Sequence, residues 1–150
     1  LLSARYSLGD LTVAAEYYRL KYDSTTTTDM SSLGQPNPEP VKETQHTEAY
    51  YGLLAYRLTD WFEAGVYYGV YYPDMDDREG DEQVAAGKPD YRAWQKDLAL
   101  SARFDITDFW LVKLEVHFMD GVAQCAEADN PDGFDEQNWT LFAVKTTFNF

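Results

Sequence analysis

The sequence predicts an all-β fold, an antiparallel up-and-down sheet of about seven strands built as a transmembrane β-barrel. Three observations predict this class. Apolar and polar residues alternate with a period of two along most of the 150 residues. A short motif recurs at intervals of roughly 50 residues, which marks a repeated supersecondary unit. Connections of about two residues alternate with connections of about twenty, like the turns and loops at the two ends of such a barrel.

The repeated motif begins with Ala, includes Arg and an aromatic residue, and ends in Asp. It occupies residues 4–10, 55–60 and 102–108. Apolar and aromatic residues resume directly after each Asp, and the Gly-Asp and Thr-Asp pairs suit tight hairpin turns. Each repeat is therefore predicted as a strand, a tight turn, a second strand and a long loop.

Alternation identifies the individual strands. In the fifth of them Leu98, Leu100 and Phe104 share one face, while Arg103 and Asp105 lie on the other. Helical spacing fits these segments poorly. The predicted strands comprise residues 1–8, 11–23, 46–58, 61–72, 91–106, 109–119 and 138–150, and they leave long loops at 24–45, 73–90 and 120–137.

The register of the second strand stays open. If it follows that of residues 109–119, then Ala14, Glu16 and Tyr18 face inward. Arg19 and Lys21 then face outward, which requires either a β-bulge or a strand that has already left the membrane.

Aromatic residues near the strand ends favour a membrane barrel over a soluble one. A soluble β-sandwich also alternates, because one of its faces packs on a core and the other meets water. Transmembrane barrels add girdles of aromatic residues at the bilayer interfaces. The predicted aromatic girdle consists of Trp61, Phe62, Phe109, Trp110, Tyr72, Phe148 and Phe150.

Mixed charge in the middle of the polar face also favours a membrane barrel. Such charges cost several kcal/mol each in a dry core unless they are paired, but little in a water-filled lumen. These side chains either line a pore or form cross-strand ladders that hold the wall, and the two roles are compatible. The predicted pore-lining residues are Arg57, Glu63, Arg103, Asp105, Lys113, Glu115, His117 and Lys145.

Composition narrows the function classes. Acidic residues number 26 and basic residues 12, so the formal net charge is -14. Binding to phosphates requires Lys and Arg, so no nucleic acid is expected as a partner. An aromatic content of 16% is too high for a disordered acidic chain. The single cysteine, Cys125, allows neither an internal disulfide nor a CxxC metal site.

The acidic segment 74–82 supplies only weak candidates for a metal site. Asp74, Asp76 and Asp77 offer the oxygen ligands that Ca²⁺ prefers. The spacing does not match an EF-hand loop, because Gly80 lies outside the required position. Carboxylates of this kind also keep a loop solvated. The sequence thus predicts no metal and no cofactor.

Three stretches carry a resemblance to a known family: residues 96–105, 111–121 and 139–150. The last alternates apolar and polar residues up to Phe150, although Thr146 stands where an apolar residue is usual. The chain resembles the C-terminal part of a Gram-negative outer-membrane porin, similar to the phosphate-selective and related gated-loop porin families. The resemblance implies passive diffusion of small hydrophilic solutes or ions through a water-filled lumen, with no enzymatic step.

The same resemblance implies a location and partners. The location is the outer membrane of a Gram-negative bacterium, in contact with its lipid and lipopolysaccharide. The barrel assembly machinery would read the C-terminal strand, and a homotrimer is expected. Single-chain barrels usually have an even number of strands, so about seven strands predict a fragment whose missing N-terminal strands close the barrel.

Three other functions stay open. A narrow structural or adhesive outer-membrane barrel would have few strands and acidic, cation-binding extracellular loops. An enzyme at the barrel rim would require His46 or His117, with Glu48 and Asp120 nearby in the sequence, to meet a nucleophile. A soluble β domain would bury the apolar face in a closed core. The residues that it would bury are Leu98, Leu100, Phe104, Val112 and Leu114.

Overall fold

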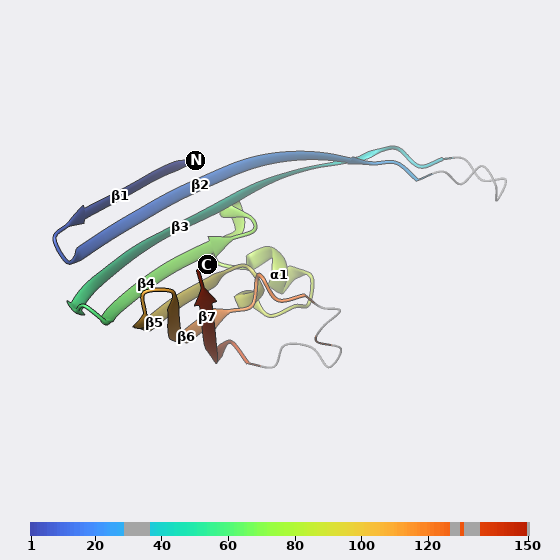
Figure 1. The fold of residues 1–150 in the computed structure, drawn as a ribbon. Coiled ribbons are helices and arrows are strands. Elements are labelled where there is room, and N and C mark those ends of the chain that lie inside the picture. The colour runs from blue at the N-terminus through green and yellow to red at the C-terminus, as the bar shows by residue number, and fades with distance from the viewer. Residues whose placement is uncertain (29–36, 127–129, 131–135, 150) are drawn as a thin grey trace.

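The computed structural model describes residues 1–28, 37–126, 130 and 136–149. Its strands form one antiparallel, seven-stranded sheet in chain order, which confirms the all-β, up-and-down prediction (Figure 1). The strands are β1 (Leu2–Leu8), β2 (Leu11–Thr26), β3 (Val41–Thr59), β4 (Phe62–Tyr72), β5 (Gln95–Thr107), β6 (Trp110–Gly121) and β7 (Asn138–Phe148). The sheet is strongly curved but open, since β1 and β7 each pair with one neighbour among the described strands.

Tight turns join the strands along one edge of the sheet, as the repeated motif predicts. Gly9 in the first turn has a φ of 56°, a conformation that a residue without a Cβ adopts readily. A backbone carbonyl in the turn also accepts a hydrogen bond from the strand that follows the hairpin. The backbone N–H of Arg57 donates to the carbonyl of Asp10, and that of Asp105 donates to the carbonyl of Trp61. The sequence repeat therefore corresponds to a repeated contact between neighbouring hairpins.

The hairpin of β2 and β3 is longer than predicted. The pairing runs without interruption to Thr26 opposite Val41, so the predicted loop at 24–45 is too long. Threonine-rich sequence has a high β propensity, and the Thr44 hydroxyl donates to the Asp23 carboxylate at 2.7 Å. In Figure 1 this hairpin extends well beyond the other strands.

The connection between β4 and β5 contains short helical turns. They are η2 (Met75–Asp77), α1 (Asp81–Ala85) and η3 (Asp90–Arg92). The predicted start of the fifth strand at residue 91 is wrong, because η3 occupies this place and β5 begins at Gln95. The N–H of Val122, just after β6, donates to the Tyr91 carbonyl at 3.0 Å, so η3 is held against the end of β6.

Cross-strand pairing divides the side chains into two faces. Residues paired across strands share a face, and successive residues alternate. One face, here called the charged face, carries Glu16, Arg57, Arg103, Lys113 and Lys145 with the residues paired to them. The other, the apolar face, leaves large apolar side chains exposed. They include Tyr6, Val13, Leu54, Val66, Leu98, Leu100, Leu114, Phe118, Phe142 and Val144.

Burial within the described residues is sparse. The apolar residues that are buried are Val70, Ala93, Ala99, Met119 and Val122. Leu98, Leu100 and Leu114 are each more than 40% exposed, with values of 41, 48 and 43%. The described part of the chain therefore does not form the closed core that a soluble β domain would require.

Candidate functional site

Cross-strand register brings part of the predicted pore lining into a single row. Arg57 lies opposite Glu63, Glu63 opposite Arg103, Arg103 opposite Lys113, and Lys113 opposite Lys145. We call these residues the basic row. The other predicted pore-lining residues lie on the same face, since each stands an even number of positions from a member of the row. These are Asp105, Glu115 and His117.

Asp105 joins two guanidinium groups at one end of the charged face. Arg57 Nη1 donates to its Oδ2 at 2.9 Å, and Arg103 Nε donates to its Oδ1 at 2.8 Å. Arg57 Nη1 also donates to the Asp60 carbonyl at 2.8 Å, which ties the network to the turn between β3 and β4. The ladder of ion pairs that the sequence left as an alternative is therefore present here.

The remaining charges divide into paired and unpaired groups. Lys113 Nζ lies 2.9 Å from Glu115 Oε1, and His117 Nδ1 lies 2.9 Å from Asp97 Oδ2. Glu63 and Lys145 make no hydrogen bond or ion pair with any residue that the structure describes. The other three members of the basic row each have an ion-pair partner.

Glu16 belongs to the charged face. It lies opposite Ser3 on β1 and Tyr51 on β3, and the register of β2 shows no bulge on either side. The open question about the second strand is thereby resolved: Arg19 and Lys21 lie on the opposite face, near the loop end of a regular strand.

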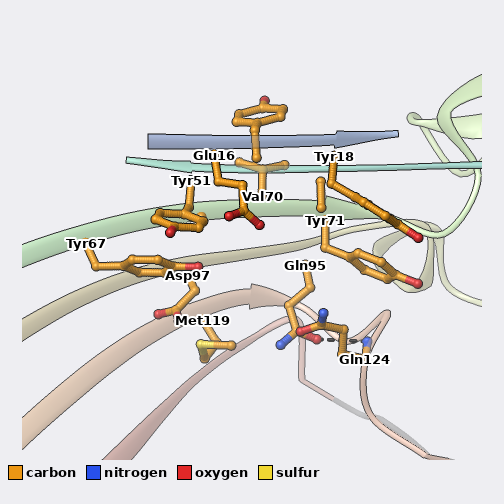
Figure 2. Close-up of a pocket in the computed structure, with 13 residues that line it drawn as sticks. Glu16, Tyr18, Tyr51, Tyr67, Val70, Tyr71, Gln95, Asp97, Met119 and Gln124 are labelled. Atoms are coloured by element: carbon orange, nitrogen blue, oxygen red, sulfur yellow. Dashed lines mark hydrogen bonds between the residues drawn. The ribbon is translucent and has the colours of Figure 1, made fainter. Parts of the chain in front are cut away.

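A pocket of about 140 Å³ lies on the charged face toward the loop end (Figure 2). Ala49 and Gly69 are the small residues of its lining, and a Cβ at Gly69 would overlap the Tyr67 ring, so the ring lies across the glycine. Tyr51 and Tyr67 have ring centroids 5.3 Å apart. The other side chains drawn at the pocket are Glu16, Tyr18, Val70, Tyr71, Gln95, Asp97, Met119 and Gln124.

Sequence reasoning missed this pocket. Tyr67, Tyr68, Tyr71 and Tyr72 stand close together near one strand end, so aromatic content alone does not distinguish them. Alternation within β4 sends Tyr67 and Tyr71 to the charged face and their neighbours to the apolar face. Counting positions along β4 from Glu63 separates them, because residues an even number of positions from Glu63 share its face.

Aromatic rings cluster at the turn edge of the apolar face. Phe62 and Phe104 have centroids 5.2 Å apart, and Trp61 lies 5.8 Å from Phe62. Trp110 and Phe148 stack at 5.6 Å with an interplanar angle of 10°. Phe104 was not predicted, although it pairs directly with Phe62.

The other predicted girdle residues have separate positions. Phe109 lies in the turn between β5 and β6 and is 52% exposed. Tyr72 lies at the loop end of β4, with the Arg78 guanidinium 5.3 Å from its ring centroid. Phe150 lies outside the described residues.

Thr146 has a structural reason for its unusual place among apolar residues. Its hydroxyl accepts a hydrogen bond from the Trp110 indole N–H at 2.8 Å. The threonine thus supplies the indole N–H with an acceptor within the aromatic cluster.

Thr146→Val should lower the free energy of unfolding by about 1 kcal/mol, because it leaves the Trp110 N–H without its acceptor at nearly constant volume. Urea titration of the full-length protein measures the change. Thr140→Val is the matched control, since Thr140 faces the same side of β7 and makes no side-chain hydrogen bond with the described residues. An equal loss in both variants would contradict the assignment.

Polar contacts mark the loop end of the apolar face. Lys96 Nζ lies 3.2 Å from Asp120 Oδ2, and Trp94 Nε1 donates to Asp120 Oδ1 at 3.1 Å. Glu48 is buried, accepts from the Tyr17 hydroxyl at 2.9 Å and pairs with Arg78. The apolar face thus ends in a polar border on the side of the long loops.

The weak metal candidates each have a local partner. Asp74 Oδ1 accepts from the N–H of Asp76, and Asp77 Oδ1 accepts from the N–H of Glu82. Asp76 Oδ2 lies 2.6 Å from His46 Nδ1. Within the described ranges, no three His, Cys, Asp or Glu side chains are arranged to hold a metal ion. These carboxylates structure the loop and hold it against β3.

The histidines do not meet the carboxylates that the sequence placed beside them. His117 pairs with Asp97 on β5, while Asp120 bonds to Lys96, Trp94 and Gln137. Burial raises the pKa of the Cys125 thiol, which favours its protonated and weakly nucleophilic form at neutral pH.

Comparison of the chain with protein-family models, with curated proteins and with solved structures found no match. Within the described residues, no helix has the length and apolar character needed to cross a bilayer.

Proposed function

We propose that this chain is part of an outer-membrane β-barrel of porin type, through which small hydrophilic solutes or ions diffuse passively. The observation that carries the proposal is the separation of the two faces. Apolar side chains stay exposed along one face, and charged side chains gather on the other. A bilayer outside and water inside would stabilise this arrangement.

The dimensions of the apolar face fit a bilayer. On β6 it extends from Trp110 to Phe118, before the polar border at Asp120. Nine residues at about 3.4 Å each cover about 30 Å along a strand, and a tilt of about 40° reduces this to about 23 Å. Outer-membrane barrels carry an apolar band of about 25 Å between aromatic girdles, and the cluster at Trp110 and Phe148 stands where one girdle would lie.

A barrel also requires closure of the sheet. The free edges of β1 and β7 carry backbone groups that lipid cannot satisfy. The proposal therefore includes further strands, from the rest of a longer chain, that close the sheet around the charged face. The alternative of an adhesive barrel with cation-binding loops gains less support, because Asp74, Asp76 and Asp77 already have partners within the chain.

The test is the single-channel conductance of the full-length protein in planar bilayers, with a salt gradient to measure the reversal potential. Stepwise conductance is expected. Arg103→Glu should move the reversal potential toward cation preference, because it changes the charge of the basic row by two units. Lys145→Glu should act in the same direction without breaking an ion pair to a described residue.

Lys21→Glu is the matched control, since Lys21 lies on the opposite face near the end of β2 and its side chain is 61% exposed. It should leave the reversal potential unchanged. Stable insertion without conductance would overturn the pore, and a soluble monomer that does not insert would overturn the membrane barrel itself.

A further inference from the structure

We infer that the tyrosine pocket binds a small organic cation through an alkylammonium group. We define the tyrosine pocket by Glu16, Tyr18, Tyr51, Tyr67 and Tyr71, with the small residues Ala49 and Gly69 between them. The inference rests on the proposed function in one respect: solute must reach the charged face.

The shape of the pocket comes from the order of small and large residues across the strands. Ala49 lies between Tyr18 and Tyr71 in one cross-strand row, and Gly69 lies between Tyr51 and Asp97 in the next. Ala49 leaves a depression between the rings of its row, whereas the Tyr67 ring lies across Gly69 and forms one wall. Its volume of about 140 Å³ suits a head group of a few heavy atoms.

The aromatic walls favour a cation. Tyrosine rings attract ammonium groups through their negative faces, and several rings around one space act together. Tyr51 and Tyr67 lie on one side of the pocket, while Tyr18 and Tyr71 lie side by side on the other (Figure 2).

The charge of the lining favours a cation as well. The Glu16 carboxylate points into the space between the two groups of rings (Figure 2), and it has no hydrogen-bond or ion-pair partner among the described residues. Asp97 lies farther along the same row and pairs with His117. No lysine or arginine belongs to the described lining.

The basic row does not cancel this local charge. Arg103 lies six positions after Asp97 on β5, a distance of about 20 Å. That exceeds the Debye length of about 8 Å at physiological salt, so the basic row acts only weakly at Asp97. Glu16 also lines the neighbouring hollow that contains Arg5 and Arg103, and it forms no ion pair with either. The cationic side chains that an anion could use lie outside the pocket lining, at Arg5 on β1 and at the basic row. A neutral sugar could use the ring faces, but it would gain nothing from the unpaired carboxylate.

The experiment measures binding of choline to the full-length protein by saturation-transfer NMR at neutral pH. A polyoxyethylene detergent is used, because it carries neither an ammonium group nor a sugar. Glu16→Gln should weaken choline binding about fivefold or more, since it removes the counter-charge and keeps the shape. Tyr71→Leu should weaken it about three- to fivefold, whereas Tyr71→Phe, which keeps the ring face, should bind within twofold of the wild type.

Glu79→Gln is the matched control for net charge. Glu79 is exposed in the loop after β4 and does not line the pocket, so its variant should bind choline normally. Equal weakening by Glu16→Gln and Glu79→Gln would overturn the site. Equal saturation transfer to glucose and choline, or loss of binding in Tyr71→Phe, would overturn the assignment to a cation. The binding measurement does not depend on current. If the protein binds choline but does not conduct, the proposed pore is contradicted and the proposed binding site is supported.

If the protein conducts but does not bind choline, only the proposed binding site is contradicted.

Discussion

Leu100→Arg is expected to lose most of its folding into lipid vesicles. Leu100 lies in the middle of the apolar face, paired with Val66 and Val116, and its side chain is 48% exposed. If this face meets lipid, a charge at the bilayer midplane costs about 2–4 kcal/mol. The fraction that folds, read from the mobility of unheated samples on gels, should fall accordingly.

The neighbouring position supplies the control. Ser101 lies on the charged face and lines a hollow of about 470 Å³ near the basic row, so Ser101→Arg has room and water for its side chain. It should fold into vesicles almost as well as the wild type. A reversed order, with Ser101→Arg the worse variant, would show that the apolar face does not meet lipid.

Asp105→Ala is expected to cost about 1–2 kcal/mol in the free energy of unfolding. The substitution removes the acceptor shared by Arg57 and Arg103, and it leaves two guanidinium groups close together without their counter-charge. Hydrogen bonds to charged groups contribute about 1.5–3 kcal/mol each, and we discount this because the three side chains are 22 to 35% exposed.

The same variant tests the pore independently. With Asp105 gone, the charged face gains net positive charge at its turn end, so the reversal potential should move toward anions. Urea titration in vesicles and planar-bilayer recording together measure the two effects. Glu79→Gln again serves as the control for net charge, and it should change neither quantity. A stability loss with no shift in reversal potential would leave Asp105 a structural residue outside the ion path.

Alternation made the strands and their faces predictable. Arg57, Glu63, Arg103, Lys113 and Lys145 were grouped from parity alone, and the register then placed them in a single row. Successive side chains of a strand point to opposite faces because of the backbone geometry. The face of each residue can therefore be predicted from the sequence wherever the alternation is clear. It was not clear near the end of β2, where polar residues occupy both faces.

The loop ends were predicted less well because their contacts are long-range. Residues 91–94 directly precede the alternation of β5, yet η3 forms there, and its Tyr91 carbonyl accepts a hydrogen bond from Val122 just after β6. Asp76 in η2 is a metal candidate because it lies in an acidic run, yet it pairs with His46 on β3. Neither partner is close in sequence, so no local pattern could identify it.

The sequence by itself determined the all-β class, the turn positions and the separation of apolar from charged residues, because these follow from a period of two and from local turn chemistry. Only the tertiary structure decided which residues stand opposite each other. Register joins Gly69 to Tyr51 and Asp97, and Ala49 to Tyr18 and Tyr71. The tyrosine pocket and the Asp105 network arise from that pairing, since each combines side chains from strands that are distant in the chain.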